Sequence, residues 1–267
     1  AYCDPHFIKS LKTYKNINLG IMFNASDLIK HTDKLDYFYR SIDIKKISFV
    51  RIACHLEEIK YINFFVKNLK RNKIKVMVNI MQISEIKKNK IRYIVEDIMK
   101  VNPDVLYLAD SLGSMNKKNI LNLYRNFKKY WKGPMGLHAH DNINNALKNS
   151  LALEKEGIEW IDSTITGMGR GPGNTKSEDI VKSFKQNFEY SNFKNFKNYI
   201  NKNFIPLKKK YKWGTNNYYK AAAKFKIHPS YVQTLLTDKR FKEYDKKFLK
   251  NNLKKKKISK FELNKIF

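Results

Sequence analysis

The feature that most constrains the fold is a regular alternation of short β-branched runs and longer amphipathic runs between residues 17 and 165. The short runs are largely apolar, which is typical of parallel strands covered by helices: residues 17–23, 47–53, 74–80, 105–109, 135–139 and 160–165. Amphipathic patterns of helical period lie between them: residues 56–71, 90–100, 116–130 and 143–156. Six strand-then-helix units predict an α/β fold, either a barrel of parallel strands or an open doubly wound sheet.

The placement of glycine favours the barrel. An open dinucleotide-binding sheet carries a glycine fingerprint after its first strand, whereas Gly20 stands alone within the first predicted strand. A TIM (β/α)8 barrel needs eight strands, and six are visible here. The chain also opens at Ala1 on a loop-like segment, AYCDPH. A TIM barrel that lacks its first two strands accounts for both facts.

The chain changes character near residue 180. Residues 181–267 carry 24 Lys and Arg against 5 Asp and Glu, a net charge of +19, and they lack the alternation of strands and helices. We expect a partial-barrel catalytic domain at residues 1–185 and a Lys-rich helical C-terminal region at residues 186–267. The lysines at 254–257 are expected to belong to a solvated face.

The whole chain has a formal charge of +30, and such a charge is typical of proteins that bind the phosphates of nucleic acids. However, 47 of its basic residues are Lys and 7 are Arg, and specific nucleic-acid sites depend on the bidentate guanidinium of Arg. We therefore expect no nucleic-acid partner. We also expect no membrane partner, because no run approaches the roughly 18 apolar residues that a membrane span needs. Cys3 and Cys54 cannot make a disulfide framework, which predicts a reducing cytoplasm.

The sharpest local signal is the segment Gly-Leu-His-Ala-His-Asp-Asn at residues 136–142. Residues two apart on a strand point to the same side, so we expect His138 and His140 to project together. At the carboxyl end of a barrel strand they would face the mouth, where barrel enzymes keep their active sites. Two neutral imidazoles on one face suit a divalent metal ion, and a pair of surface histidines is the alternative.

Other polar groups also follow predicted strands. Asp110 and Ser111 come directly after the fourth strand, where they either line a site or merely start the next connection. Residues 166–174 contain four glycines, and such a loop either approaches a ligand closely or serves as a flexible turn into a helix. Thr175 and Glu178 have the spacing of a capping box for that helix.

The second predicted strand carries an unusual charge and a cysteine. Arg51 lies within an apolar strand and needs a partner there, because an isolated buried charge is costly. A lone cysteine such as Cys54 is more often a small core residue than a nucleophile.

Four segments, in this order and spacing, resemble the metal-dependent family of hydroxymethylglutaryl-CoA lyase, isopropylmalate synthase and 4-hydroxy-2-oxovalerate aldolase: VRIACHLEE, YLADSLGSM, GLHAHDN and IDSTITGMGRGPGNTKSE. The resemblance covers about residues 15–185 and is nearest to the aldolase branch. It implies a TIM barrel lacking its first two strands, with the visible strands as the third to the eighth, followed by a helical C-terminal region.

The resemblance also implies roles for individual residues. His138 and His140 match the family's metal-binding histidines, Ser111 matches a position near the substrate carboxylate, and Asn174 matches a residue that supports or joins the metal site. The implied reaction cleaves a 4-hydroxy-2-oxo acid to pyruvate and an aldehyde, with Mn²⁺ or Mg²⁺ stabilising the enolate. A base takes the proton of the 4-hydroxyl group, and His55 is a candidate for that base.

One motif of the family does not occur in this chain. It is an Arg-Asp-Gly strand whose surroundings supply the third metal ligand, an aspartate. Two histidines alone hold the hard ions Mg²⁺ and Mn²⁺ poorly. The aldolase therefore stands beside three alternatives: a synthase that condenses an acyl-CoA with a 2-oxo acid, a catalytically inactive barrel, and a nucleic-acid binder.

The C-terminal region carries a series of residues that indicates contacts with another protein chain. A Trp-Gly…Tyr…His-Pro-x-Tyr series at residues 213–231 looks like the C-terminal segment of bacterial proteins of this family. That segment takes part in subunit or partner contacts, so the resemblance implies a homo-oligomer or a partner enzyme. The alternative is a small helical bundle that completes the fold.

Overall fold

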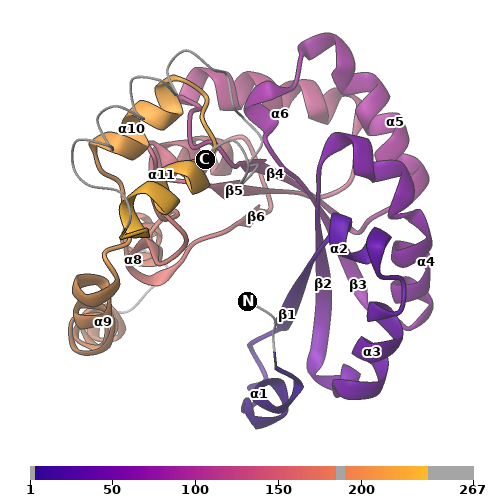
Figure 1. Ribbon diagram of the computed structural model, residues 1–267, viewed down its shortest axis with the longest axis horizontal. Helices are drawn as coiled ribbons and strands as arrows, with labels where there is room; N and C mark the ends of the chain where they lie inside the picture. The colour runs from indigo at the N-terminus through magenta and orange to yellow at the C-terminus, as the bar shows by residue number, and fades with distance from the viewer. Residues whose placement is uncertain (1–3, 185–189, 240–267) are drawn as a thin grey trace. The chain divides into compact units, whose positions relative to one another are not determined.

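The structure, a computed structural model, describes residues 4–184 and 190–239, and every structural statement below concerns these residues. Six strands follow sequence order in one parallel sheet: β1 (Leu19–Asn24), β2 (Ile47–Cys54), β3 (Lys75–Ile80), β4 (Val105–Asp110), β5 (Met135–Ala139) and β6 (Trp160–Ile161) (Figure 1). The helices are α1 (Pro5–Ser10), α2 (Ala25–Lys30), α3 (Lys34–Ser41), α4 (Asn63–Arg71), α5 (Ile91–Val101), α6 (Lys117–Tyr130), α7 (Ala146–Glu154), α8 (Ser177–Ser183), α9 (Tyr190–Tyr211), α10 (Asn217–Lys224) and α11 (Pro229–Thr237). The predicted α/β class, the six strands and the helical C-terminal region are confirmed.

Two predicted elements differ from the observed ones. The predicted helix at residues 56–71 is a 3₁₀ turn, Leu56–Tyr61, followed by α4. The amide of Ile62 bonds to the carbonyl of Ile59, three residues back, so the chain is wound more tightly there. The last predicted strand, 160–165, is shorter, because after β6 the amide of Thr164 bonds to the carbonyl of Thr175 instead of to a neighbouring strand.

The described chain forms two compact units. The first is made of Ala1–Met81, Ile86–Leu108 and Asn126–Met135, and the second of Gln82–Glu85, Ala109–Arg125 and Gly136–Phe267. The division at residue 185 proposed from the sequence stays a prediction.

The first unit is built on β1, β2, β3 and most of β4. Parallel register places Val50 beside Val76, and α4 and α5 pack along one face of these strands (Figure 1). The side chains between strands and helices are almost fully buried: Val50, Ile52, Val66, Leu69, Val76, Val78, Val95 and Ile98. Burial of this apolar surface is the main force that holds the helices on the sheet.

The unusual residues of β2 have structural partners. The guanidinium of Arg51 lies 3.8 Å from the centre of the Tyr107 ring, so the charge predicted to need a partner has one. Cys54 is fully buried, and burial raises the pKa of its thiol to about 12, with a further contribution from the carboxylates of Glu58 and Glu57. A thiol in this environment stays protonated, which fits the core role.

Every helix within residues 4–184 and 190–239 is too short or too polar to cross a bilayer.

The packing of α4 makes a testable prediction. Leu69→Ala removes a fully buried side chain, and we expect it to lower the free energy of unfolding by about 2–5 kcal/mol, because it leaves a cavity. Met99→Ala on α5 is the matched control, since Met99 is 58% exposed, and we expect a change within about 0.5 kcal/mol. Urea denaturation followed by circular dichroism measures both, and equal losses in the two variants would contradict this packing.

Candidate metal centre

A pair of histidines marks the end of β5 in the second unit. His138 and His140 lie two residues apart, and their ring centres are 5.2 Å apart with the ring planes at 72°. Nδ1 of His138 is 2.8 Å from Oδ2 of Asp162, and Nδ1 of His140 is 3.0 Å from the carbonyl oxygen of Ser111. A carboxylate and a carbonyl can only accept, so both Nδ1 atoms donate, and in the neutral imidazoles both Nε2 atoms keep a lone pair. This arrangement is typical of histidines that bind a metal through Nε2.

The register of the sheet explains the first of these contacts. Leu137 pairs with Ile161 in the parallel ladder of β5 and β6, and the amide of Asp162 bonds to the carbonyl of Leu137 at 3.0 Å. His138 is the next residue of β5 and Asp162 directly follows β6, so their side chains meet. Asp162 was not predicted as a site residue, since its only signal in the sequence is a carboxylate near the end of the neighbouring strand.

His140 is held as a neutral imidazole. Its pKa is lowered to about 3, mainly by burial and secondly by repulsion from the neighbouring His138 when that ring is protonated. The charges of Arg170 and His228 act in the same direction, whereas the hydrogen bond to Ser111 opposes them. A neutral imidazole is the form that coordinates metals.

Asp110 and Ser111 form the turn that supports His140. Asp110 is 1% exposed and accepts hydrogen bonds from the amides of Ser114 and Met115, at 3.2 and 3.0 Å. Burial raises the pKa of its carboxyl to about 6, and the amide hydrogen bonds oppose that shift. This geometry supports the structural alternative for Asp110, in which it starts the connection after β4.

Ser111 contacts the site in two ways. Its carbonyl accepts from His140, and its hydroxyl oxygen accepts from the amide of Gln82 at 3.0 Å. Gln82 is 8% exposed and has a φ of +56°, a strained conformation for a residue other than glycine. Gln82 carries no signal in the sequence that predicts this contact. The substrate-binding role of Ser111 stays a prediction.

The glycine-rich loop returns to the end of β5. Asn174 forms a β-bridge with His140, and its side-chain Nδ2 donates to the carbonyl of Met168 at 3.2 Å. The loop is too tight for larger residues, because a Cβ on Gly173, where φ is +79°, would lie 2.5 Å from the carbonyl oxygen of Gly167. The backbone of Asn174 therefore lies beside His140, and its role as a supporting residue or ligand stays a prediction.

The capping box predicted for the next helix is wrong. The carboxylate of Glu178 accepts from the amide of Thr166 at 2.9 Å, and the hydroxyl of Thr175 lies 3.2 Å from that of Ser150. Helix α8 begins at Ser177 after Lys176, which makes no side-chain cap. Glu178 thus secures the glycine-rich loop, a long-range contact that the local spacing could not reveal.

His55, the residue suggested as general base, belongs to the first unit. Its amide donates to Oε2 of Glu58 at 2.7 Å, where the chain enters the 3₁₀ turn after β2. Its catalytic role stays a prediction. Among the described residues, no third His, Cys, Asp or Glu completes a three-residue metal cluster.

The fold and the site define an α/β protein of parallel strands whose candidate site residues lie at the carboxyl ends of the strands. The family model described as HMGL-like matches residues 48–197, more than half of the chain. The chain belongs to the HMGL-like family.

Relatives and solved structures agree with this membership. The chain is 30% identical to a 4-hydroxy-2-oxovalerate aldolase of Pelotomaculum thermopropionicum over 136 residues. The matched region covers 51% of this chain and 40% of the relative. It is 38% identical to the aldolase of the same name from Geobacillus genomosp. 3 over 78 residues, and this matched region covers 29% of this chain and 23% of the relative. The chain thus spans less than half the length of each of these relatives.

Two solved structures share the fold. The N-terminal domain of a protein provisionally described as an aldolase, from Bacteroides vulgatus, superposes with a TM-score of 0.72 at 28% identity, over 88% of this chain and 78% of that one. The HMG-CoA lyase of Bacillus subtilis gives a TM-score of 0.57 at 14% identity, over 68% of this chain and 66% of that one, a likeness of fold. The TIM-barrel relationship expected from the motifs is confirmed.

The contact between His138 and Asp162 makes a second prediction. We expect Asp162→Ala to weaken Mn²⁺ binding by about 10–100-fold, because the imidazole loses the acceptor that orients it. Glu159→Ala, an exposed carboxylate three residues earlier, is the matched control. Titration followed by electron paramagnetic resonance of free Mn²⁺ gives both dissociation constants, and equal constants would count against a metal at this pair.

Proposed function

We propose that the protein is a divalent-metal-dependent C–C lyase, an aldolase that cleaves a 4-hydroxy-2-oxo acid to pyruvate and an aldehyde. The observation that carries the proposal is the histidine pair at the end of β5, in which both Nδ1 atoms donate to oxygen. Membership of the HMGL-like family and the aldolases among the relatives support the reaction class.

The residues fit a metal as two of its ligands. Nε2 of His138 and Nε2 of His140 would hold Mn²⁺ or Mg²⁺, and oxygen donors would complete the set, as these hard ions require. The keto and carboxylate oxygens of a 2-oxo acid are such donors. A bound ion supplies Lewis-acid stabilisation of the negative charge that develops on the substrate when the C–C bond breaks.

The chain's own residues prepare this site. Asp162 and the Ser111 carbonyl fix the two imidazole rings before any ligand binds, so little reorganisation is needed during the reaction. We assign the Ser111 hydroxyl to the substrate carboxylate and Asn174 to the support of His140. His55 is proposed as the base that takes the proton of the 4-hydroxyl group.

We also propose a cellular compartment for the enzyme and a role for its C-terminal region in assembly. We place it in the cytoplasm, which the two cysteines and the burial of Cys54 support. We further propose a homo-oligomer or a partner enzyme that docks through the C-terminal region.

Removal of either histidine tests the proposed reaction. We expect His138→Ala and His140→Ala to lower the rate of Mn²⁺-dependent pyruvate release by at least about 100-fold, because transition-state charge is no longer stabilised. His31→Ala, a change at an exposed histidine after α2, should keep the wild-type rate. Lactate dehydrogenase and NADH report the pyruvate formed from a 4-hydroxy-2-oxo acid.

Two other outcomes would point elsewhere. Wild-type rates in both histidine variants would contradict the proposal. Release of free thiol from acetyl-CoA in the presence of a 2-oxo acid, without pyruvate formation, would favour the condensing synthase.

A further inference from the structure

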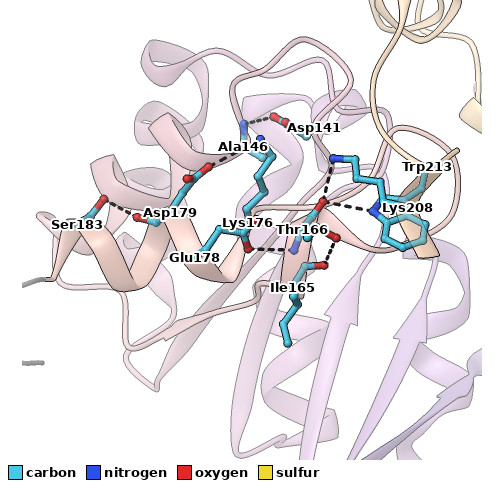
Figure 2. A network of polar contacts seen from close by, with 10 residues as sticks. All are labelled: Asp141, Ala146, Ile165, Thr166, Lys176, Glu178, Asp179, Ser183, Lys208 and Trp213. Atoms are coloured by element: carbon cyan, nitrogen blue, oxygen red, sulfur yellow. Dashed lines mark hydrogen bonds and ion pairs between the residues drawn. The ribbon is translucent and has the colours of Figure 1, made fainter. Parts of the chain in front are cut away.

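One carbonyl in the glycine-rich loop receives two hydrogen bonds from the C-terminal region. Nζ of Lys208, in α9, lies 3.3 Å from the carbonyl oxygen of Thr166, and Nε1 of Trp213 lies 3.2 Å from the same oxygen (Figure 2). These donors come from positions 42 and 47 residues further along the chain. All three residues belong to the second unit.

The amide, hydroxyl and carbonyl groups of Thr166 are all hydrogen-bonded. It is 3% exposed and has a φ of +56°, a conformation that β-branched residues rarely adopt. Its amide donates to Glu178 at 2.9 Å, and its hydroxyl donates to the carbonyl of Ile165 at 2.7 Å (Figure 2). Strained conformations of this kind persist only where the surrounding contacts enforce them, and they cluster at functional sites.

The inner side of the same loop bonds to the segment that carries the histidines. The amide of Asn174 bonds to the carbonyl of Gly167 at 3.2 Å, and Asn174 forms the β-bridge with His140. The amide of Asp141 bonds to the carbonyl of Gly173 at 2.9 Å. The loop backbone therefore links Thr166, through Gly167 and Asn174, to His140.

Two more contacts tie the C-terminal region to these turns. The amide of Gly214 bonds to the carbonyl of Gly171 at 3.0 Å, and the hydroxyl of Thr215 donates to the carbonyl of Asn142. Residues 208–215 thus reach both the loop and the turn that follows His140.

We propose that Lys208 and Trp213 are positioning residues of the histidine site. They fix the Thr166 carbonyl, and through the glycine-rich loop they set the position of His140. Neither side chain needs to touch substrate or metal for this role. The inference rests on the proposed function only for its metal-binding measurement, because the position of His140 is observable without any metal.

The experiment uses substitutions that remove the hydrogen-bond donor and keep much of the apolar side chain. Lys208→Met keeps the length of the side chain, and Trp213→Phe keeps an aromatic ring while removing the N–H donor. Lys209→Met is the matched control, because Lys209 is an exposed lysine on the same helix. Lys208→Arg is the rescue, since it restores a cationic donor.

Three quantities are measured on the intact protein. Hydrogen exchange reports the amides of Thr166, Asn174 and Asp141, and ¹⁵N NMR of labelled histidine reports the ring nitrogens of His140. Mn²⁺ titration reports the dissociation constant. We expect each single variant to speed loop exchange and weaken Mn²⁺ binding by about fivefold, the effect of one lost hydrogen bond, with larger effects in the double variant. The His140 resonances should shift or broaden in the double variant, and Lys209→Met and Lys208→Arg should behave as wild type.

Unchanged His140 resonances in the double variant would overturn the inference, even if the loop amides exchange faster, since the C-terminal contacts would then only add stability. Shifted His140 resonances in a protein that binds no Mn²⁺ would support the inference and refute the proposed function. Equal effects of Lys209→Met and Lys208→Met would also overturn it, because the result would then reflect lost charge and not the bond to Thr166.

Discussion

The hydrogen bond between His138 and Asp162 is the contact on which the rest of the site depends. It follows from the parallel register of β5 and β6, which places the two residues side by side where the strands end. Because Nδ1 of His138 is hydrogen-bonded to Asp162, Nε2 is the ring nitrogen that is available to a metal ion. The Ser111 carbonyl holds Nδ1 of His140 in the same way. Two contacts that the backbone places thus orient both imidazoles, so the geometry of the histidine pair follows from the sheet and its turns.

The strands were predictable because each is a short, largely apolar run, and β3, β4 and β5 bury side chains on both faces, a pattern that needs no knowledge of distant residues. The winding of residues 56–61 was not, because an amphipathic stripe reports which side chains face the core and not whether the backbone turns by three or four residues. The short β6 was also beyond local pattern, since its end is set by Thr164 bonding to Thr175 across the loop.

Some residues of the candidate site were likewise predictable from local sequence, and others depend on distant contacts. His138 and His140 were predictable from strand alternation, because a spacing of two puts both on one side. Asp162 depends on register, and Gln82 depends on a turn that brings its amide to Ser111. The spacing of Glu178 predicts a local helix cap, yet its carboxylate accepts from the amide of Thr166 instead. Contacts with Lys208 and Trp213 span more than 40 residues and leave no mark in local sequence.

The most direct test of this account is anomalous diffraction from crystals of the protein soaked in Mn²⁺. We predict an anomalous peak within coordination distance of Nε2 of His138 and Nε2 of His140, with both Nδ1 atoms still hydrogen-bonded to Asp162 and the Ser111 carbonyl. Well-ordered histidines with no peak between their Nε2 atoms, or a manganese ion bound elsewhere on the chain, would contradict it.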